Sequence, residues 1–209
     1  MLAIAGGKGG CGKTTTALGL ARALADRGQA PLVADADRDM PDLHYRAGVS
    51  RRAGLSAVAD GTPVDAVAQR SARFQGVDVL PCGDADGGVA ATAFDRLGRS
   101  GRPVLLDCPA GAGPDAVAPL RAADRTVLVS TPTERSLRDT VKTAAMAREL
   151  DAPPAALVLV RSEGTADPTA LFDCPTVAHV PELSEPPLET EESVSRYAHC
   201  VKTLFERNT

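Results

Sequence analysis

The sequence predicts an α/β fold in which a mostly parallel, twisted sheet is flanked by helices in three layers. The first observation is that short apolar runs alternate along the chain with stretches of helical periodicity. The second is a composition with 3% aromatic residues and no tryptophan, so that Ala, Val and Leu must build the core, as suits buried parallel strands. No repeat or separating linker is evident, so we expect residues 1–209 to form one domain.

The strands are predicted from these apolar runs, which are bounded by polar residues, glycine or proline. They are expected at residues 2–5, 31–35, 77–81, 103–107, 125–130, 155–160 and 176–180.

The helices are predicted from apolar residues that recur at helical spacing. The first covers residues 14–27 and ends at Gly28, with an apolar face of Leu18, Ala21, Leu24 and Ala25. Short helices are expected at residues 55–59, 64–70 and 114–122. A long one at residues 136–150 should turn a stripe towards the sheet that consists of Leu137, Val141, Ala144, Ala145 and Leu150. The last, at residues 189–207, has a stripe of Val194, Tyr197, Ala198, Val201, Leu204 and Phe205.

Charge and cysteine content exclude several classes of protein. The formal net charge of −4 argues against a protein that coats nucleic acid. The five cysteines are an odd number and form no CxxC pair, which predicts reduced thiols in a cytosolic protein. The first apolar stretch is too short for a signal peptide or a membrane span, so we expect a cytoplasmic protein.

A glycine-rich segment between the first strand and the first helix carries the strongest functional signal. Residues 7–14 read GKGGCGKT and satisfy G-x-x-x-x-G-K-[ST] in the required strand–loop–helix context. Glycines let main-chain N–H groups converge on phosphate oxygens, and the following helix adds the positive end of its dipole. We expect Lys13 to bridge the β- and γ-phosphates and the Thr14 hydroxyl to bind Mg²⁺. A Rossmann dinucleotide site is disfavoured, because its G-x-G-x-x-G pattern does not call for this Lys-Thr pair. The predicted nucleotide contacts in the loop are Gly7, Lys8, Gly9, Gly10, Cys11, Gly12, Lys13, Thr14 and Thr15.

A second lysine, Lys8, stands at the start of this loop. With it, the segment GGKGGCGKTTTALGLARALADRG resembles the opening of the MinD/ParA family of P-loop ATPases, which has the deviant loop KGGxGKT. The resemblance implies a P-loop ATPase fold, ATP and Mg²⁺ as ligands, and a weak intrinsic turnover on the order of 10⁻³ s⁻¹. It also implies a homodimer across ATP, in which Lys8 reaches the partner's nucleotide.

Two acidic segments end predicted strands, where ligands bind in open α/β sheets. Residues 35–43, DADRDMPDL, resemble the family's switch I, which implies that Asp37 positions water and Mg²⁺ and that Asp35 is a structural acid. Residues 104–111, VLLDCPAG, resemble switch II, which implies that Asp107 is an outer-shell magnesium partner. Gly111 would bring a backbone N–H towards the γ-phosphate. The resemblance thus implies a catalytic set of Lys8, Lys13 and Asp37, and a metal set of Thr14, Asp37 and Asp107.

The later part of the chain bears on the nucleotide base and on the partners. An NKxD motif is missing, which favours ATP over GTP. Arg161 stands where the family places an adenine-reading Asn, whereas Val180, Pro181 and Glu182 match a segment whose backbone packs against adenine, so Pro181 and Glu182 are predicted base contacts. The last helix resembles the family's final structural helix and lacks a border rich in Lys and Arg, so direct membrane binding is not expected.

The resemblance leads to one main hypothesis and leaves rivals open. The main one is a MinD/ParA-like ATPase that positions division, partition or other cargo components and is released by an unidentified protein activator. One rival is a ParA-type DNA-partition ATPase, with candidate phosphate contacts at Arg121, Arg125, Arg135, Arg138 and Arg148. Another is a small-molecule ligase or synthetase of the same superfamily. An iron–sulfur protein is disfavoured, because the spacing of Cys82 and Cys108 does not match and no CxxC is present.

Overall fold

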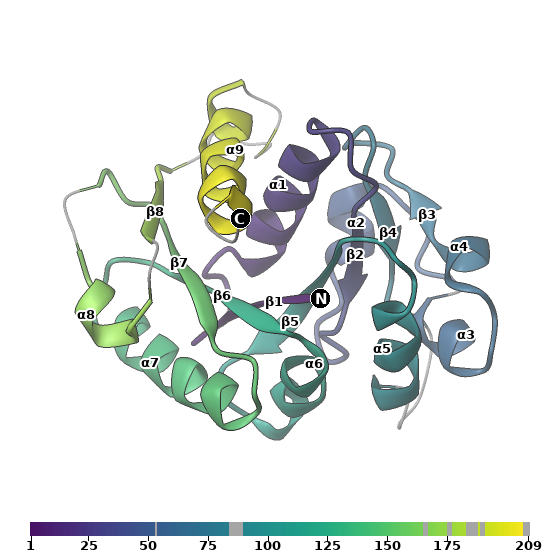
Figure 1. Cartoon of the computed structure of the whole chain (residues 1–209), viewed down its shortest axis with the longest axis horizontal. Coiled ribbons are helices and arrows are strands. Elements are labelled where there is room, and N and C mark those ends of the chain that lie inside the picture. Colours follow the sequence, from purple (N-terminus) through teal and green to yellow (C-terminus); the bar gives the residue numbers. More distant parts are fainter. Residues whose placement is uncertain are drawn as a thin grey trace.

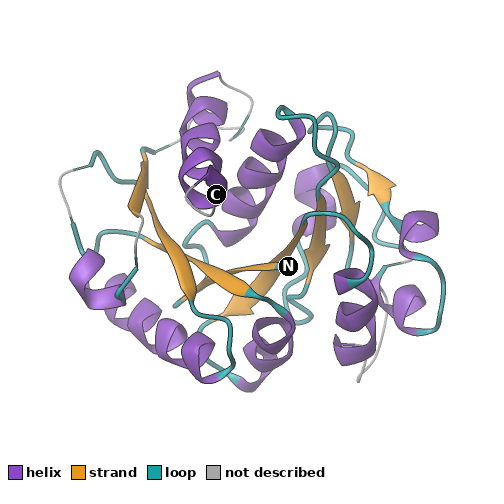
Figure 2. Ribbon diagram, viewed as in Figure 1, coloured by secondary structure: helices purple, strands orange, loops and turns teal. Residues whose placement is uncertain are grey.

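The computed structural model describes residues 1–52, 54–83, 90–164, 167–174, 177–182, 188 and 191–206. Within these residues the chain forms an eight-stranded sheet with helices on both faces (Figures 1 and 2), which confirms the predicted three-layer α/β fold. The strands are β1 (Leu2–Gly6), β2 (Leu32–Asp35), β3 (Gln69–Arg70), β4 (Asp78–Leu80), β5 (Val104–Ala110), β6 (Arg125–Ser130), β7 (Pro154–Val160) and β8 (Val177–Val180).

The strand order is β3-β4-β2-β5-β1-β6-β7-β8. All neighbouring strands pair in parallel except the edge strand β3, which is antiparallel to β4. Strand β1 lies between β5 and β6, so the loop that follows it starts in the middle of the sheet. Because the strands are parallel, the carboxyl ends of β1, β2, β5 and β7 meet at one edge, which is where ligands bind in such sheets.

Helices cover the two faces of the sheet and enclose a core on each. They are α1 (Lys13–Ala25), α2 (Leu43–Ala47), α3 (Leu55–Ala59), α4 (Val64–Val67), α5 (Ala90–Gly98), the 3₁₀ turn η1 (Pro114–Ala116), α6 (Val117–Ala122), α7 (Glu134–Glu149), α8 (Thr169–Phe172) and α9 (Glu191–Glu206). Helices α1 and α9 lie side by side on one face (Figure 1). Strand residues alternate between the two cores: Ile4 packs under α1, while Ala3 and Ala5 pack on the opposite side with residues of α5 and α6.

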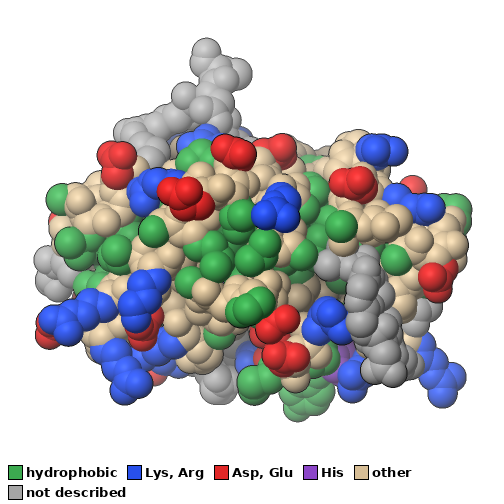
Figure 3. Space-filling view, turned by 90° about the horizontal axis from the view of Figure 1, so that it is seen from below, with side chains coloured by type: hydrophobic (Ala, Val, Ile, Leu, Met, Phe, Trp, Pro, Cys, Tyr) green, Lys and Arg blue, Asp and Glu red, His purple; other side chains and the backbone are tan. Residues whose placement is uncertain are grey.

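The face seen from below in Figure 3 has apolar side chains in its middle and charged side chains around them. Helices α6 and α7 lie on this side of the molecule in Figure 1. Ala122 of α6, Met146 of α7 and Leu150, which follows α7, are partly buried and pack on the core that contains Ala3 and Ala5. In the described part of the chain no helix is both long enough and apolar enough to cross a membrane.

The contact between α1 and α9 depends on a glycine in the middle of α1. A Cβ atom on Gly19 would lie 2.4 Å from Cδ2 of Tyr197, so any other residue there would collide with the ring. The Tyr197 hydroxyl lies 3.3 Å from Oγ1 of Thr16, and both side chains are buried. The ring and this hydrogen bond fix the helix that carries the phosphate loop.

Most predicted elements are present, with ends that match the prediction or differ by up to three residues, and a few predictions are wrong. The predicted helix over residues 64–70 ends at Val67, and Gln69 and Arg70 form the edge strand β3 instead. Helices α2, α5 and α8 were not expected from the sequence. Thr176, Glu189 and Arg207, at the ends of predicted elements, lie outside the described residues, as does the side chain of Phe205.

The predicted inner faces of two helices also need correction. In α7, Val141 and Ala145 are exposed, and the buried face consists mainly of the polar residues Ser136, Thr140 and Thr143, with Ala144 and Ala147. The Ser136 hydroxyl accepts from the Thr131 N–H and the Thr140 hydroxyl from the Gly7 N–H, contacts that a search for apolar periodicity cannot detect. In α9, Ala198 is exposed, while Tyr197, Val201 and Leu204 are buried as predicted.

Candidate functional site

The loop between β1 and α1 turns at the carboxyl edge of the sheet. Gly12, immediately before α1, has φ of 90°, a left-handed conformation that glycine adopts without strain. Gly7 is needed for a different reason, since a Cβ atom there would lie 2.4 Å from the backbone nitrogen of Thr140. The Gly7 N–H donates to the Thr140 hydroxyl at 3.3 Å, so the start of the loop is held against α7.

A cavity of about 360 Å³ opens beside this loop. Its size is within the usual range for small-molecule sites. Ten of the predicted site residues line it: Gly9, Gly10, Gly12, Lys13, Thr14, Thr15, Asp37, Asp107, Pro181 and Glu182. Gly7, Lys8, Cys11 and Gly111 are not among the lining residues; Cys11 is fully buried beneath the loop.

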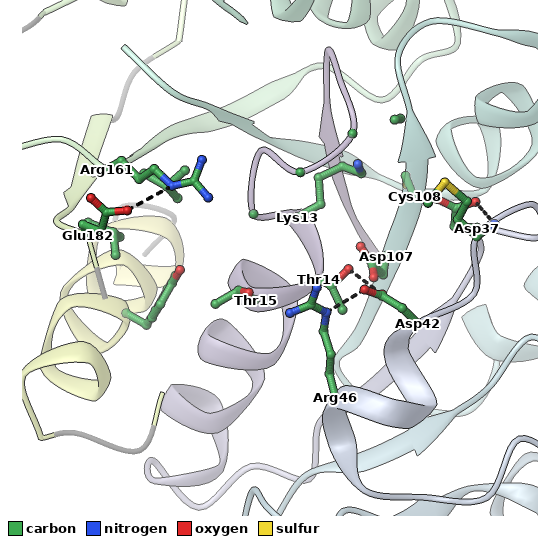
Figure 4. A pocket seen from close by; sticks show the side chains of 18 of the residues that line it. Lys13, Thr14, Thr15, Asp37, Asp42, Arg46, Asp107, Cys108, Arg161 and Glu182 are labelled. Carbon is green, nitrogen blue, oxygen red and sulfur yellow. Dashed lines mark hydrogen bonds and ion pairs between the residues drawn. The ribbon is translucent and has the colours of Figure 1, made fainter. Parts of the chain in front are cut away.

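Lys13 and Thr14 begin α1 at the floor of the cavity (Figure 4). The Lys13 residue is only 8% exposed, although lysine is almost never buried without an anionic partner. The free N–H groups of the first turn of α1 lie at the same end of the helix, because they have no acceptor within it. This end of the cavity therefore carries both a cation and main-chain donors, which is the chemistry that binds phosphate.

Two acids are buried near Lys13 and Thr14: Asp35 ends β2, and Asp107 lies within β5. Burial, with a contribution from the charge of Asp107, raises the pKa of Asp35 to about 8. Burial also raises the pKa of Asp107 to about 7, against the effects of the neighbouring Thr14 hydroxyl and of the Lys13 charge. Among the described residues, Oδ2 of Asp35 and Oδ1 of Asp107 have no hydrogen-bond partner.

These groups fit the magnesium ion that accompanies a nucleotide. The oxygen ligands that Mg²⁺ prefers are present in Thr14 and the nearby carboxylates, and Asp107, which lines the cavity, has one oxygen without a partner among the described residues. In the part of the chain that the structure describes, no three acidic, histidine or cysteine side chains are placed to hold a metal by themselves. Magnesium commonly takes its remaining ligands from phosphate and water, so the ion would bind together with the nucleotide.

Residues of the acidic segment 35–43 line one side of the cavity. Asp37 is half-buried, and its Oδ1 accepts a hydrogen bond from the Met40 N–H at 3.1 Å. Thr14 Oγ1 donates to Oδ1 of Asp42 at 3.2 Å, and Arg46 Nε donates to Oδ2 of the same carboxylate at 2.6 Å (Figure 4).

Asp42 and Arg46 were not predicted as site residues. The sequence offered two signals: the two residues are four positions apart, and Asp42 is a further acid in the segment 35–43. Helix α2 was not expected, and without it nothing in the sequence brings Arg46 to the cavity.

The other end of the cavity is formed by the ends of β7 and β8. Val160, Val180 and Pro181 give it an apolar lining. Arg161 Nε lies 3.7 Å from Oε1 of Glu182, so this ion pair bridges the two strand ends (Figure 4). Arg161, where an Asn was expected, has a left-handed backbone with φ of 53°.

Gly111 lies beside the start of the phosphate loop. Its N–H donates to the Gly6 carbonyl at 2.9 Å, and its φ is 84°. The predicted movement of this N–H towards a γ-phosphate would first have to break that bond.

Comparison with known proteins gives a consistent result. The sequence matches the family model described as the CobQ/CobB/MinD/ParA nucleotide binding domain over residues 2–203. It is 28% identical over 196 residues to an uncharacterized ATP-binding protein of Methanocaldococcus jannaschii, an alignment that covers 89% of this chain and 73% of that protein. It is 31% identical over 151 residues to the septum site-determining protein MinD of Synechocystis sp., covering 66% of this chain and 56% of that protein. The chain thus spans little more than half the length of that MinD.

Among solved structures, the fold is similar to the cell division ATPase MinD of Pyrococcus furiosus. The TM-score is 0.80 at 26% sequence identity, and the match covers 100% of this chain and 98% of the other.

Proposed function

Because the chain belongs to the CobQ/CobB/MinD/ParA nucleotide-binding family, we propose that it is a MinD-like ATPase that binds ATP with Mg²⁺, dimerises across it and hydrolyses it slowly. The observation that carries this proposal is the position of Lys13. It is buried at the first turn of α1, in a cavity that also contains Thr14 and the unpartnered Asp107 oxygen. A buried ammonium beside free helix N–H groups favours a polyphosphate.

The residues at the phosphate end act by binding and orientation. The N–H groups of the loop and Lys13 hold the β- and γ-phosphates, while Thr14 and Asp107 hold the magnesium side. Bound magnesium neutralises charge that develops on the phosphate oxygens. Asp37, held half-buried through its bond to the Met40 N–H, orients the attacking water. Pro181 and Glu182 contact the base.

Lys8 acts on the nucleotide of a second protomer. In this chain it is half-buried at the edge of the loop and does not line the cavity beside Lys13. A partner protomer that brings its own Lys8 over the open side would add a cation to the γ-phosphate and exclude water. Hydrolysis would remove that interaction and release the dimer, which is how a weak ATPase can serve as a timed switch.

The cellular task that we propose is the positioning of a cargo or of division and partition components. The support is the similarity to MinD of Synechocystis and to the cell division ATPase MinD of Pyrococcus furiosus. A protein activator that speeds hydrolysis completes this scheme, since the unassisted rate is expected to be low.

The test measures nucleotide binding and molecular size together. Wild-type protein should bind a fluorescent ATP analogue with Mg²⁺, and should elute as a dimer with a non-hydrolysable ATP analogue but not with ADP. Lys13→Ala should weaken binding at least tenfold, because it removes charge-assisted hydrogen bonds to phosphate. Lys202→Ala, on the exposed side of α9, is the matched control and should behave as wild type. Wild-type protein without affinity for any nucleoside triphosphate would overturn the proposal.

The same experiment with duplex DNA tests the partition role. ATP-dependent DNA binding that weakens with salt would move the proposal towards a ParA-type function. Of the five arginines suggested for this role, Arg138 is paired with Glu134, and Arg148 donates to the Phe172 carbonyl.

A further inference from the structure

Asp42 lies at the start of α2, where an aspartate is usually explained as a helix cap. A capping carboxylate accepts a hydrogen bond from a backbone N–H of the first turn. The Asp42 side chain makes no such bond. Both of its oxygens are directed elsewhere, Oδ1 to the Thr14 hydroxyl at 3.2 Å and Oδ2 to Arg46 Nε at 2.6 Å. Capping therefore does not account for this side chain.

The Thr14 hydroxyl has one proton and two lone pairs. An oxygen that binds a metal does so through a lone pair, so its proton must be directed away from the metal. Two carboxylates are within reach of that proton, Asp42 and the buried Asp107. The contact of 3.2 Å directs the proton to Oδ1 of Asp42, and Oδ1 of Asp107 has no hydrogen-bond partner among the described residues.

We infer that Asp42, held by Arg46, is a further positioning residue of the magnesium site: it accepts the Thr14 proton, so that a Thr14 lone pair and Asp107 both face the ion. This inference rests on the proposed function and assigns to Asp42 a role that the phosphate loop and the two switch acids do not supply.

The local charges agree with a cation at this position. Asp42 adds a carboxylate near Asp35, Asp37 and Asp107. Burial is the main cause of the raised pKa values of Asp35 and Asp107, and the charge of Asp42 also contributes to them. Such crowding of like charges is unfavourable unless a cation binds among them. Arg46 compensates the negative charge only at Oδ2 of Asp42. The side chains of Arg46 and Asp42 remain almost half exposed, at 44% and 45%.

Arg46 has a defined part in this arrangement. It donates from one turn further along α2, at i,i+4 spacing, and also lines the cavity. Its bond prevents the Asp42 carboxylate from turning to solvent, which half-exposed aspartates otherwise do. The pair thus makes the magnesium site depend on the presence of α2.

The experiment measures what magnesium adds to nucleotide affinity. A fluorescent ATP analogue is titrated into each variant once with EDTA and once with excess Mg²⁺, and the ratio of the two dissociation constants is the magnesium gain. The variants are Asp42→Ala, Asp42→Asn and Arg46→Ala. The matched controls are Asp26→Ala and Arg22→Ala, which break another i,i+4 pair with an Nε–Oδ1 distance of 3.0 Å, located on α1. Thermal melts establish that each variant is folded.

Asp42→Ala should lower the magnesium gain about tenfold or more, as is usual when an outer-shell partner of a metal ligand is removed. The affinity in EDTA should stay at the wild-type value. Asp42→Asn should have a magnesium gain between those of the wild type and Asp42→Ala, because the amide oxygen still accepts the Thr14 proton but carries no charge. Arg46→Ala should show a smaller loss, and both controls none. In the background of Thr14→Val, Asp42→Ala should cause no further loss, because the two residues act through one bond.

An Asp42→Ala variant with the magnesium gain of the controls would overturn the inference. So would a loss of equal size with and without magnesium, which would indicate a structural role. Wild-type protein that binds no nucleotide under either condition would overturn the proposed function and this inference together. The titration of the wild-type protein distinguishes this outcome from a failure of the inference alone.

Discussion

Asp35 and Asp107 are direct partners in the parallel pairing of β2 and β5, and both side chains are buried. Burial supplies the larger part of the cost of ionising Asp35, and the charge of Asp107 adds to that cost. Neighbouring strands thus bring two acids together behind the phosphate loop, and this arrangement should be visible in the pH dependence of stability.

We expect the nucleotide-free protein to lose stability as pH rises from about 4 to about 8. Unfolded carboxyl groups titrate near pH 4, whereas the folded values are about 8 for Asp35 and about 7 for Asp107. Below the unfolded pKa both states are protonated and no penalty exists. Between the unfolded and the folded pKa of each acid, the folded protein holds a proton that the unfolded chain has released. The free energy of unfolding therefore falls as pH rises. Several pKa units at about 1.4 kcal/mol each give a penalty of several kcal/mol at pH 8.

Melting temperatures measured across this pH range test the expectation. Asp35→Asn should flatten the decline, since the amide does not titrate, whereas Asp60→Asn, at an exposed site, should leave the slope unchanged. A wild-type melting temperature that rises steadily from pH 5 to pH 8 would contradict the raised pKa values.

Lys8→Ala should separate nucleotide binding from dimerisation. Lys8 does not line the cavity, so the variant should bind an ATP analogue with nearly wild-type affinity. It should fail to form the ATP-dependent dimer, because the cation contributed to the partner's nucleotide is missing. Size-exclusion chromatography with light scattering measures this, with Lys202→Ala as the control. Loss of nucleotide affinity comparable to that of Lys13→Ala would show that Lys8 acts within its own protomer.

Asp37→Ala should retain ATP but slow its hydrolysis. A positioned acid or base commonly contributes a hundredfold or more to the rate, so single-turnover hydrolysis should slow by about that factor and the ATP-bound dimer should persist. The exposed neighbour Asp39 provides the control Asp39→Ala. Unchanged turnover and dimer lifetime in Asp37→Ala would remove Asp37 from the mechanism.

Gly7→Ala and Gly9→Ala should differ in stability although the residues are two positions apart. The added methyl group at Gly7 meets the α7 backbone, with 2.3 Å to the carbonyl carbon of Asp139, whereas at Gly9 no atom of the described residues lies within 4 Å. Forced overpacking typically costs about 1–3 kcal/mol, so Gly7→Ala should unfold at a lower temperature. Gly9→Ala should melt close to wild type. Equal melting temperatures would mean that the loop and α7 are not in close contact.

The parts of the fold that could be predicted from sequence are those with a local cause. The phosphate loop needs glycines, a lysine and a threonine at fixed spacing, and the strands are apolar runs, so a short window contains their whole signal. The membership of the MinD/ParA family, predicted from the loop residues, is confirmed by the family match over residues 2–203.

What could not be predicted arises from tertiary contacts. The buried face of α7 is built from Ser136, Thr140 and Thr143, whose polarity resembles that of a solvent-exposed face until the groups they bond to are known. Helix α2 was not expected from the sequence, and only the three-dimensional arrangement brings Asp42 to Thr14. The roles of the predicted site residues, although ten of them line one cavity, remain predictions that the variants above address.

The close approach of Gly19 to Tyr197 has a consequence for biosynthesis. The helix that bears the predicted phosphate loop is synthesised well before α9, yet the ring that packs against Gly19 belongs to α9. During that interval the nascent chain exposes an apolar surface that chaperones can bind. The end of the molecule that carries the predicted phosphate loop therefore becomes fully packed only when α9 docks.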